Sequence, residues 1–420
     1  MNRILRILAL IIAGEMIYGL PFHTQRLFRP TMLDAFGITN TQLGDMSAVF
    51  GITAMVSYFF GGPLADRYSA RSLMSTSLVL TALGGFYMAT IPSVFAMKLL
   101  YGFWGVTTSF LFWAALIKAT RDWGGSSAQG IAFGILDGGR GLAAAMLGAL
   151  AVGILASYLP EQLGQTSSAD RQAGMGNIIS YYASITLACA VLVWLLVPHD
   201  ERSVNSVRNP FSGVPEVIKR PLAWSQAGII ICAYCGYKGV DNYSLYAVQV
   251  LGKNEIEAAL LSNYGFYVRP VGAVMAGVIA DRFGSARSIL VMFLAMVVTY
   301  GVLSVATLET ATLFVIYANL FVTLFAVYAL RGIYYALLEE TRTPKYLTGA
   351  SVAVIAFIGY TPEIFFGPVT GRILDANPGA LGFHNYFQFL ATMSAIGVAI
   401  SALLLRLNRR QAPRIVVADK

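Results

Sequence analysis

Long apolar runs alternate with short polar segments along the whole 420-residue chain. A helix that crosses the hydrocarbon core of a bilayer needs roughly 17–25 mainly apolar residues. Twelve runs of this kind lie at 4–30, 43–63, 72–91, 94–117, 128–157, 176–198, 222–249, 256–279, 286–307, 311–338, 346–370 and 384–407. Because hydrocarbon offers no water to backbone groups, each run is predicted to be a helix, which makes the chain an all-α polytopic membrane protein. The first run is too long for a signal-peptide core and no small-residue cleavage site follows it, so it is predicted to remain as the first helix.

A short polar segment occurs twice, each time at the end of an apolar run. Residues 62–72 read GPLADRYSARS and residues 277–288 read GVIADRFGSARS, with one extra residue, Gly284, in the second copy. Residue 277 follows residue 62 by 215 positions, about half of the chain. Self-similarity at a fixed spacing indicates an internal repeat. We therefore predict two related six-helix bundles, at 1–198 and 222–420, joined by a polar cytoplasmic linker at 199–221.

The distribution of basic residues predicts the orientation of the chain. Only 12% of the residues are charged and 57% are hydrophobic, whereas soluble domains are about 25% charged. A net charge of +8 is compatible with nucleic-acid binding, but nineteen of the 29 Lys and Arg residues fall in loops on the side of the N-terminus. Basic loops stay on the cytoplasmic side of a membrane. The excess is therefore interpreted as a topology signal, with both termini cytoplasmic and no nucleic-acid partner.

Few residues in this chain are suited to covalent or metal chemistry. Cys232 and Cys235 have CxxC spacing, which suits redox or metal chemistry, but two small apolar residues on one helix face are the favoured interpretation. The histidines lie at 23, 199 and 384, and no Ser-His-Asp or metal-ligand set accompanies them. The sequence contains no P-loop motif, so it gives no indication that ATP is the energy source. We expect neither an enzyme nor a bound metal or cofactor.

The repeated segment carries charges that suit a gate between the two bundles. These charged positions are Asp66, Arg67 and Arg71 in the first copy and Asp281, Arg282 and Arg287 in the second. A carboxylate at the end of one helix can accept bonds from the free N–H groups of the next helix. The arginines can pair across the seam between the bundles and so hold the cytoplasmic side shut in one conformation. A basic anchoring loop with a helix cap is the alternative, but two copies at symmetric positions favour the gating role.

The repeated loop resembles the G-x-L-A-D-R-x-x-x-R motif of the major facilitator superfamily. Gly62, Leu64, Ala65, Asp66, Arg67 and Arg71 match it, and Ser69 stands where the family usually has Gly. Together with the two six-helix halves and the central linker, the resemblance covers the full chain. It implies a secondary transporter of twelve helices that works by alternating access. The seventh run, with Tyr237 and Asp241, also resembles the organophosphate/organic-anion branch of that superfamily.

Nine charged residues are the candidates for charges buried within the predicted spans. They are Glu15, Arg26, Asp137, Arg140, Lys238, Asp241, Arg269, Arg331 and Glu363. A charge at the bilayer centre costs about 2.5–3.5 kcal/mol on insertion scales, so each should face protein or a water-filled cavity. The third, sixth, ninth and twelfth runs carry no charge in their interiors. The resemblance implies that those four helices face lipid and that the others line a central cavity.

The spacing of these charges suggests which of them pair. Asp137/Arg140 and Lys238/Asp241 are three residues apart, so each pair could neutralise itself along one helix face. The 215-residue offset of the repeat also places Arg26 opposite Asp241, and His23 opposite Lys238. Arg269 and Arg331 have no acidic residue within a turn on their own helices. They need partners from elsewhere in the fold, or an anionic ligand.

Five cations against four acids inside the spans indicate an anionic substrate. The predicted substrate-binding residues are Arg140, Lys238, Arg269, Arg331, Tyr18, Tyr237 and Tyr267. The predicted proton-coupling residues are Glu15, Asp137, Asp241 and Glu363, because burial penalises the charged form of a carboxylate. Guanidinium groups suit carboxylates and phosphates, and Tyr hydroxyls can hold oxygen-rich ligands. For any single Tyr, ordinary packing is the alternative.

These features predict a transporter that works as a monomer in the inner membrane. Its substrate is expected to be a small organic anion (a carboxylate, sugar acid or organophosphate), moved together with protons. A proton-driven exporter of amphipathic compounds is the alternative within transport, but it gives the surplus cations no role. A membrane sensor that binds a ligand without moving it is a third possibility, which the lack of an added cytoplasmic domain disfavours.

Overall fold

A computed structural model describes residues 3–125, 129–159, 167–199, 213–306, 312–344 and 347–411. Within these ranges every regular segment is helical and no strand occurs. Large apolar side chains point away from the protein on many helices, among them Phe95, Val274 and Phe314, which is 80% exposed. Such a surface suits a protein whose surroundings are lipid rather than water.

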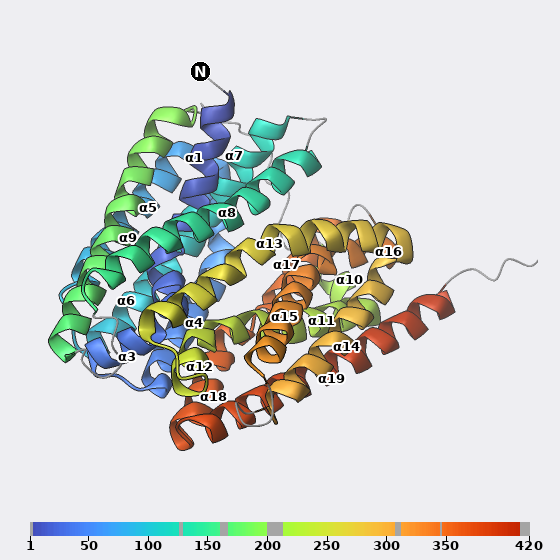
Figure 1. Cartoon of the computed structure of the whole chain (residues 1–420). Coiled ribbons are helices and arrows are strands. Elements are labelled where there is room, and N and C mark those ends of the chain that lie inside the picture. The colour runs from blue at the N-terminus through green and yellow to red at the C-terminus, as the bar shows by residue number, and fades with distance from the viewer. Residues whose placement is uncertain are drawn as a thin grey trace, which may run out of the picture.

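The N-terminal half begins with a bent span and continues with long helices (Figure 1). Its elements are α1 (Arg3–Met16), η1 (Gly19–His23), α2 (Thr24–Leu27), α3 (Arg29–Phe36), α4 (Asn40–Arg67), α5 (Ala70–Met88), α6 (Val94–Val106), η2 (Thr107–Trp113), α7 (Ala114–Gly124), α8 (Gln129–Ala156) and α9 (Ser168–Leu196). The first predicted span, 4–30, is divided among α1, η1 and α2. Its two parts meet at an angle of 42°, in a π-helical turn that contains Pro21, and both features bend helices.

The C-terminal half repeats this plan. Its elements are α10 (Val214–Ile218), α11 (Pro221–Gly239), η3 (Val240–Asn242), α12 (Tyr243–Gln249), α13 (Glu255–Phe283), α14 (Ser285–Leu303), α15 (Leu313–Ile333), η4 (Tyr334–Ala336), α16 (Leu337–Glu340), α17 (Thr348–Gly359), α18 (Pro362–Ala376) and α19 (Ala380–Gln411). The twelve predicted runs all fall on helices. By length and hydropathy alone, seven helical stretches among the described residues qualify as spans, and the bent first span is an eighth. The other four runs lie in α4, α5, α11–α12 and α13.

Each half has its own apolar core. One core is built almost entirely from residues before position 200, and the other from residues after 213. Ala259 and Phe266 of α13 are the two C-terminal residues that join the first core. The predicted linker at 199–221 lies largely outside the described residues, so its course stays a prediction.

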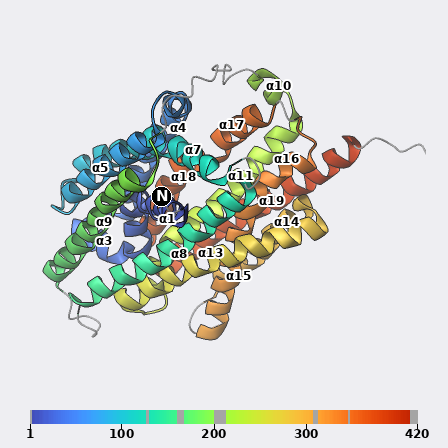
Figure 2. The ribbon, with the colours of Figure 1, turned by 90° about the horizontal axis from the view of Figure 1, so that it is seen from above.

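The two halves meet along two helix pairs. Helix α4 packs on α18, and α8 packs on α13; the second pair runs side by side in Figure 2. Small residues allow the approach, since a Cβ on Gly44 would overlap the backbone of Gly367, and one on Gly141 would touch Pro270. Close helix packing of this kind is typical of membrane interiors.

Polar contacts between the halves gather at one end of the bundle. Arg171 Nε donates to Glu255 Oε1 at 2.6 Å, and Thr31 Oγ1 donates to Glu255 Oε2 at 2.6 Å. The Asp375 carboxylate accepts the backbone N–H groups of Asn40 (3.1 Å) and Thr41 (2.7 Å). It therefore satisfies the free N-terminal groups of α4 from the other half of the molecule. We call this end, where α4 and α13 begin, the sealed end.

The repeated loops lie at the opposite end, where α4 and α13 finish. The Arg71 guanidinium covers the ring of Trp194, and the Arg282 guanidinium lies near that of Phe283. No ion pair joins the two copies within the described residues, and the side chain of Asp66 lies outside them. The ribbons of the two halves diverge from α3, α12 and α18 toward α7 and α16 (Figure 1). Among the described side chains the predicted gate pairs are not formed, and the gating role of the repeated segment stays a prediction.

Substitution of Gly44 by Ala should destabilise the contact between the halves. The new Cβ would overlap the Gly367 carbonyl, and overpacking costs roughly 1–3 kcal/mol. Gly134→Ala in α8 is the matched control, because a Cβ there meets no atom within 4 Å and Ala favours a helix over Gly. Thermal unfolding in detergent should show a lower midpoint for Gly44→Ala and an unchanged or higher one for Gly134→Ala. Equal midpoints would show that this seam does not hold the conformation.

Candidate functional site

The nine predicted intramembrane charges gather near the seam, with one histidine among them. We name two groups. The Glu15 cluster is Glu15, His23, Asp137, Arg140 and Arg269, and the Asp241 cluster is Arg26, Lys238, Asp241 and Glu363. Each cluster takes residues from both halves of the chain. Arg331 is the charge that belongs to neither.

In the Glu15 cluster, one buried carboxylate holds three basic groups. Glu15 Oε2 lies 2.9 Å from Arg140 Nε, and Glu15 Oε1 lies 3.2 Å from both Arg269 Nη1 and His23 Nε2. Arg269 also donates from Nη2 to Asp137 Oδ1 at 2.7 Å. Arg269 comes from α13, whereas its two carboxylate partners come from α1 and α8. The sequence did not identify an ion-pair partner for Arg269. The structure shows that the N-terminal half supplies it.

In the Asp241 cluster, a second buried carboxylate holds two cations. Arg26 Nε donates to Asp241 Oδ1 at 2.6 Å, and Lys238 Nζ lies 3.0 Å from Asp241 Oδ2. Lys238 also lies 3.3 Å from Glu363 Oε2, and the Tyr234 hydroxyl donates to Glu363 Oε1. The Arg26–Asp241 pair crosses the seam between α2 and η3. It joins the two positions that the repeat offset relates.

The structure distinguishes the two predicted local pairs. Lys238 and Asp241 do pair three residues apart, but Asp241 also takes Arg26 from the other half. Arg140 Nη1 lies as far as 4.0 Å from Asp137 Oδ1, whereas Arg140 Nε lies 2.9 Å from Glu15 Oε2. Neither pair is therefore self-contained. The buried charges are neutralised mainly between helices and across the seam.

Breaks in the helices place several of these residues. His23 ends the π-helical turn η1, Asp241 lies in the 3-10 turn η3, and Glu363 follows the break between α17 and α18. Pro362 at that break has no backbone N–H to continue a helix. Interrupted spans of this kind direct side chains and backbone groups into transporter interiors.

Of the five cations named as buried in the spans, Arg331 on α15 is the one that forms no ion pair within the described residues. Its guanidinium carbon lies 3.8 Å from the ring centroid of Tyr237, and its Nη1 is buried without a hydrogen-bond partner. Stacking on an aromatic face stabilises the cation but uses none of its N–H groups. Arg331 thus retains hydrogen-bonding capacity for a ligand.

Tyrosines connect the charges but do not all join them. Tyr237 lies between two guanidinium groups, because Arg26 Nη1 donates to its hydroxyl at 3.3 Å while Arg331 covers its ring. Tyr18 lies under Arg140, 5.9 Å from ring centroid to guanidinium carbon. Tyr267 is 43% exposed and stands about 200° around α13 from Arg269. The structure therefore places Tyr267 away from both clusters.

Two basic residues that the sequence analysis did not assign to substrate or proton sites, His23 and Arg26, belong to the clusters. Glu15 and His23 are eight residues apart, about 12 Å along a straight helix. They meet because η1 bends the span between them. Arg26 could have been recognised from the repeat offset, whereas no periodic pattern reveals the contact of His23 with Glu15.

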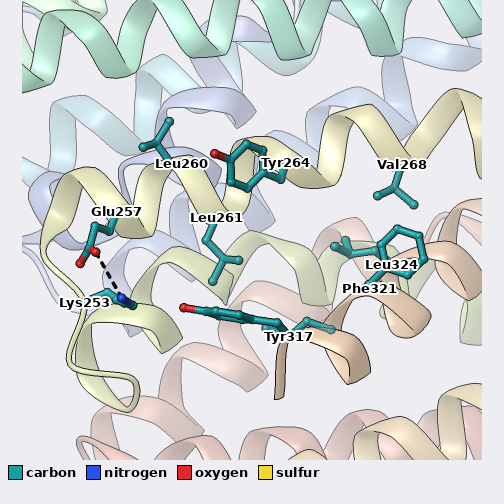
Figure 3. Close-up of a pocket in the computed structure, with 10 residues that line it drawn as sticks. Lys253, Glu257, Leu260, Leu261, Tyr264, Val268, Tyr317, Phe321 and Leu324 are labelled. Atoms are coloured by element: carbon teal, nitrogen blue, oxygen red, sulfur yellow. Dashed lines mark hydrogen bonds and ion pairs between the residues drawn. The ribbon is translucent and has the colours of Figure 1, made fainter. Parts of the chain in front are cut away.

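A hollow on the surface of the C-terminal half lies away from these charges. A groove of about 460 Å³ runs between α13 and α15 and is lined by Lys253, Glu257, Leu260, Leu261, Tyr264, Val268, Tyr317, Leu320, Phe321 and Leu324 (Figure 3). Its charged residues bind each other, with Lys253 Nζ 3.2 Å from Glu257 Oε1. It shares no residue with the two clusters. We therefore take the clusters and Arg331 as the candidate site.

The cysteines and the carboxylates give no sign of a metal centre. Cys232 and Cys235 are free and buried in α11. No group of three or more His, Cys, Asp or Glu side chains in the described residues could hold a metal ion. Both cysteines belong to the apolar core of the C-terminal half.

Comparison with known proteins identifies the family. Residues 11–367 match the Major Facilitator Superfamily. The chain belongs to this superfamily. It is therefore a multi-pass membrane protein and a secondary transporter rather than an enzyme. The fold expected from the repeated motif is confirmed.

Two relatives and one solved structure illustrate the range of similar transporters. The inner membrane protein YihN of Escherichia coli (strain K12) is 25% identical over 424 residues, which cover 98% of this chain and 97% of YihN. The probable nitrate/nitrite antiporter NarK1 of Thermus thermophilus is 25% identical over 64% of this chain and 59% of its own length. The nucleoside transporter NupG has a TM-score of 0.74 at 12% identity, covering 96% of this chain and 100% of NupG. This last likeness shows the fold alone.

The Arg26–Asp241 pair should be strongly coupled. Removal of one partner leaves the other charge buried, which costs about 3–5 kcal/mol. Thermal unfolding should therefore show a large loss of stability for Asp241→Asn and for Arg26→Gln. The double variant should lose much less stability than the two single variants together. The control pair Lys253→Gln/Glu257→Gln is largely exposed, and such pairs contribute about 0–1 kcal/mol. Additive losses at Arg26 and Asp241 would contradict the direct pairing.

Proposed function

We propose that this protein transports a small organic anion (a carboxylate, sugar acid or organophosphate) across the inner membrane by alternating access, coupled to protons. Arg331 is the observation that carries the proposal. It is an intramembrane cation with a buried, unbonded Nη1 and no ion pair in the described residues. The energetic cost of placing a charge there is offset when an anion binds it.

The charge balance of the site supports an anionic substrate. With His23 neutral, the Glu15 cluster contains two arginines and two carboxylates, and the Asp241 cluster contains two cations and two carboxylates. Arg331 therefore leaves the site with one uncompensated positive charge. A guanidinium that stacks on a ring through its face presents its N–H groups along its edge, where a carboxylate or phosphate can accept two bonds. Tyr237 thus orients Arg331 for such an anion.

The relatives are compatible with this substrate class without naming it. NarK1 is named for nitrate and nitrite, which are anions, whereas NupG is named for nucleosides. Members of one fold therefore carry unlike substrates, because function depends on the site grafted on the fold. The proposal for this chain depends on its own unpaired arginine.

The distribution of seam contacts supports the alternating-access part of the proposal. The halves are joined at the sealed end by Arg171–Glu255 and by Asp375 on the N-terminus of α4. At the other end, no ion pair among the described side chains joins the two repeated loops. The positive-inside rule orients the repeated loops toward the cytoplasm. This conformation would then be open to the cytoplasm, and the opposite conformation would require the sealed-end contacts to break and the repeated loops to close.

A ligand screen on purified protein tests the proposed substrate class. Sugar phosphates, sugar acids, monocarboxylates, dicarboxylates and lipophilic cations are compared for thermal stabilisation, and each stabilising compound is then assayed for flux in proteoliposomes with a pH gradient. At least one anion should stabilise the protein and be transported. Stabilisation by lipophilic cations alone would favour the amphipath exporter, and binding without flux under any gradient would favour a sensor.

Arg331→Gln should weaken binding of the anion that emerges from this screen. A hydrogen bond to a charged group contributes about 1.5–3 kcal/mol, so its dissociation constant should rise roughly 10- to 100-fold. Arg331→Lys keeps the positive charge but lacks the paired N–H groups of a guanidinium. Its dissociation constant should therefore lie between those of Arg331→Gln and the wild type. Lys253→Gln is the control, because Lys253 lines the groove between α13 and α15. This variant should bind the anion with wild-type affinity. Wild-type affinity in Arg331→Gln would remove this residue from the site.

A further inference from the structure

His23 is a buried titratable group for which anion binding gives no role. Its side chain is only about 4% exposed, and its ring packs near those of Phe266 and Tyr182, with centroids 5.0 and 6.0 Å away. Its Nε2 faces Glu15 Oε1 at 3.2 Å. Its Nδ1 is buried and has no hydrogen-bond partner among the described residues.

The partners of Glu15 define the protonation state of this imidazole. Arg140 and Arg269 both contact the Glu15 carboxylate, and two guanidinium groups stabilise its ionised form. An ionised carboxylate only accepts hydrogen bonds, so His23 Nε2 must carry the hydrogen. In the neutral ring, Nδ1 then holds the free lone pair. The neutral form of His23 is thus a base whose basic nitrogen has no hydrogen-bond partner among the described residues.

The four carboxylates predicted to carry protons are less suited to that role. Glu15 contacts two arginines, Asp137 contacts Arg269, and Asp241 contacts Arg26. Glu363 contacts Lys238 and accepts the Tyr234 hydroxyl. Opposite charges and donated hydrogen bonds both favour the ionised form of a carboxylate. Each of the four would therefore lose an ion-pair contact by taking up a proton while its cation stays in place.

We propose that His23, rather than one of these carboxylates, carries the coupling proton. This inference rests on the proposed function, proton-coupled transport of an anion. A proton binds the lone pair of Nδ1, both ring nitrogens then carry hydrogen, and the Glu15 cluster changes from neutral to one positive charge. Together with the uncompensated charge of Arg331, the protonated site carries two positive charges. Protonation therefore strengthens the attraction of the site for an anion, so proton and anion bind together. On release, the proton leaves Nδ1 and the ring returns to its neutral form.

The groups around His23 link its proton to the conformation of the protein. Glu15 on α1 stabilises the protonated imidazolium form of His23, and Tyr182 on α9 is uncharged. Three nearby cations destabilise that protonated form: Arg26 on α2, Arg140 on α8 and Arg269 on α13. Among these, Arg269 comes from the other half, and its contact with Glu15 crosses the seam. When the halves part at this level, Glu15 loses Arg269, and a protonated His23 in its own half can replace that cation. Protonation and the seam contact are therefore alternatives, and this is a coupling between sites.

Nuclear magnetic resonance of the ligand-free protein tests the proton site without knowledge of the substrate. The chain has three histidines, so ¹⁵N-histidine labelling gives three imidazoles, which His23→Gln, His199→Gln and His384→Gln assign. The imidazole missing in His23→Gln should titrate between about pH 5 and 8, where histidine can exchange protons in the cell. An imidazole that keeps one protonation state over that range would overturn the proposal.

Transport separates the loss of the proton site from the loss of the substrate site. The anion found in the ligand screen, with labelled gluconate as the first probe, is followed in proteoliposomes. An inward proton gradient should accelerate wild-type uptake, and His23→Gln should lose this acceleration while retaining anion exchange without a gradient. His199 is the first residue of the predicted linker. His199→Gln should therefore show the same gradient-accelerated uptake as the wild type. Gradient-driven uptake by His23→Gln would contradict the proposal.

The two proposals fail in different ways. If wild-type protein moves no anion of the panel, the proposed function fails, and the titration still decides whether His23 exchanges a proton. If His23→Gln loses anion exchange as well, His23→Asn and the titration show whether the proton site or the fold has been lost. Asp137→Asn tests the alternative carrier, since Asp137 has the most exposed side chain of the four carboxylates. Loss of the gradient response in Asp137→Asn, with the response retained in His23→Gln, would assign the proton to the carboxylate instead.

Discussion

The need to neutralise charges inside a hydrocarbon slab governs the centre of this protein. Four carboxylates lie within the spans, and each is within 3.3 Å of a cationic side chain. An unpaired ion there would cost several kcal/mol. The bends and breaks of the first, seventh and eleventh spans are where these partners meet. The centre of the protein is therefore organised by its ion pairs as much as by its apolar packing.

The same pairs relate the substrate to the motion of the two halves. Glu15 keeps Arg140 and Asp241 keeps Lys238 within its own half. Arg26 and Arg269, in contrast, take their carboxylate partners across the seam. Separation of the halves at this level would thus leave two cations to be satisfied, while the acids remain paired. An anion that enters the site can replace the missing carboxylates, which makes the pairs competitors of the substrate rather than fixed supports.

The positions of the spans could be predicted from the sequence because hydropathy is a local property, and all twelve runs are helical. The nine intramembrane charges could be identified for the same reason. Their contacts were less accessible. The repeat offset related Arg26 to Asp241, since symmetric positions of a duplicated fold meet near its axis. The approach of Glu15 to His23 depends on a bend, and the partners of Arg269 depend on how α13 packs against α1 and α8. Tyr267 was assigned to the cavity by proximity in sequence, but two residues correspond to more than half a turn of helix.

Comparison of the two halves explains why a histidine is placed at this site. The 215-residue offset relates His23 of η1 to Lys238 of α11, and each binds a carboxylate next to the seam, Glu15 and Asp241 respectively. A lysine with two carboxylate partners is a fixed cation, whereas an imidazole in the same position can hold its charge or release it. Duplication thus supplied two equivalent basic positions, one permanent and one switchable. If both were permanent, the pair of clusters would bind an anion but could not couple its release to a proton.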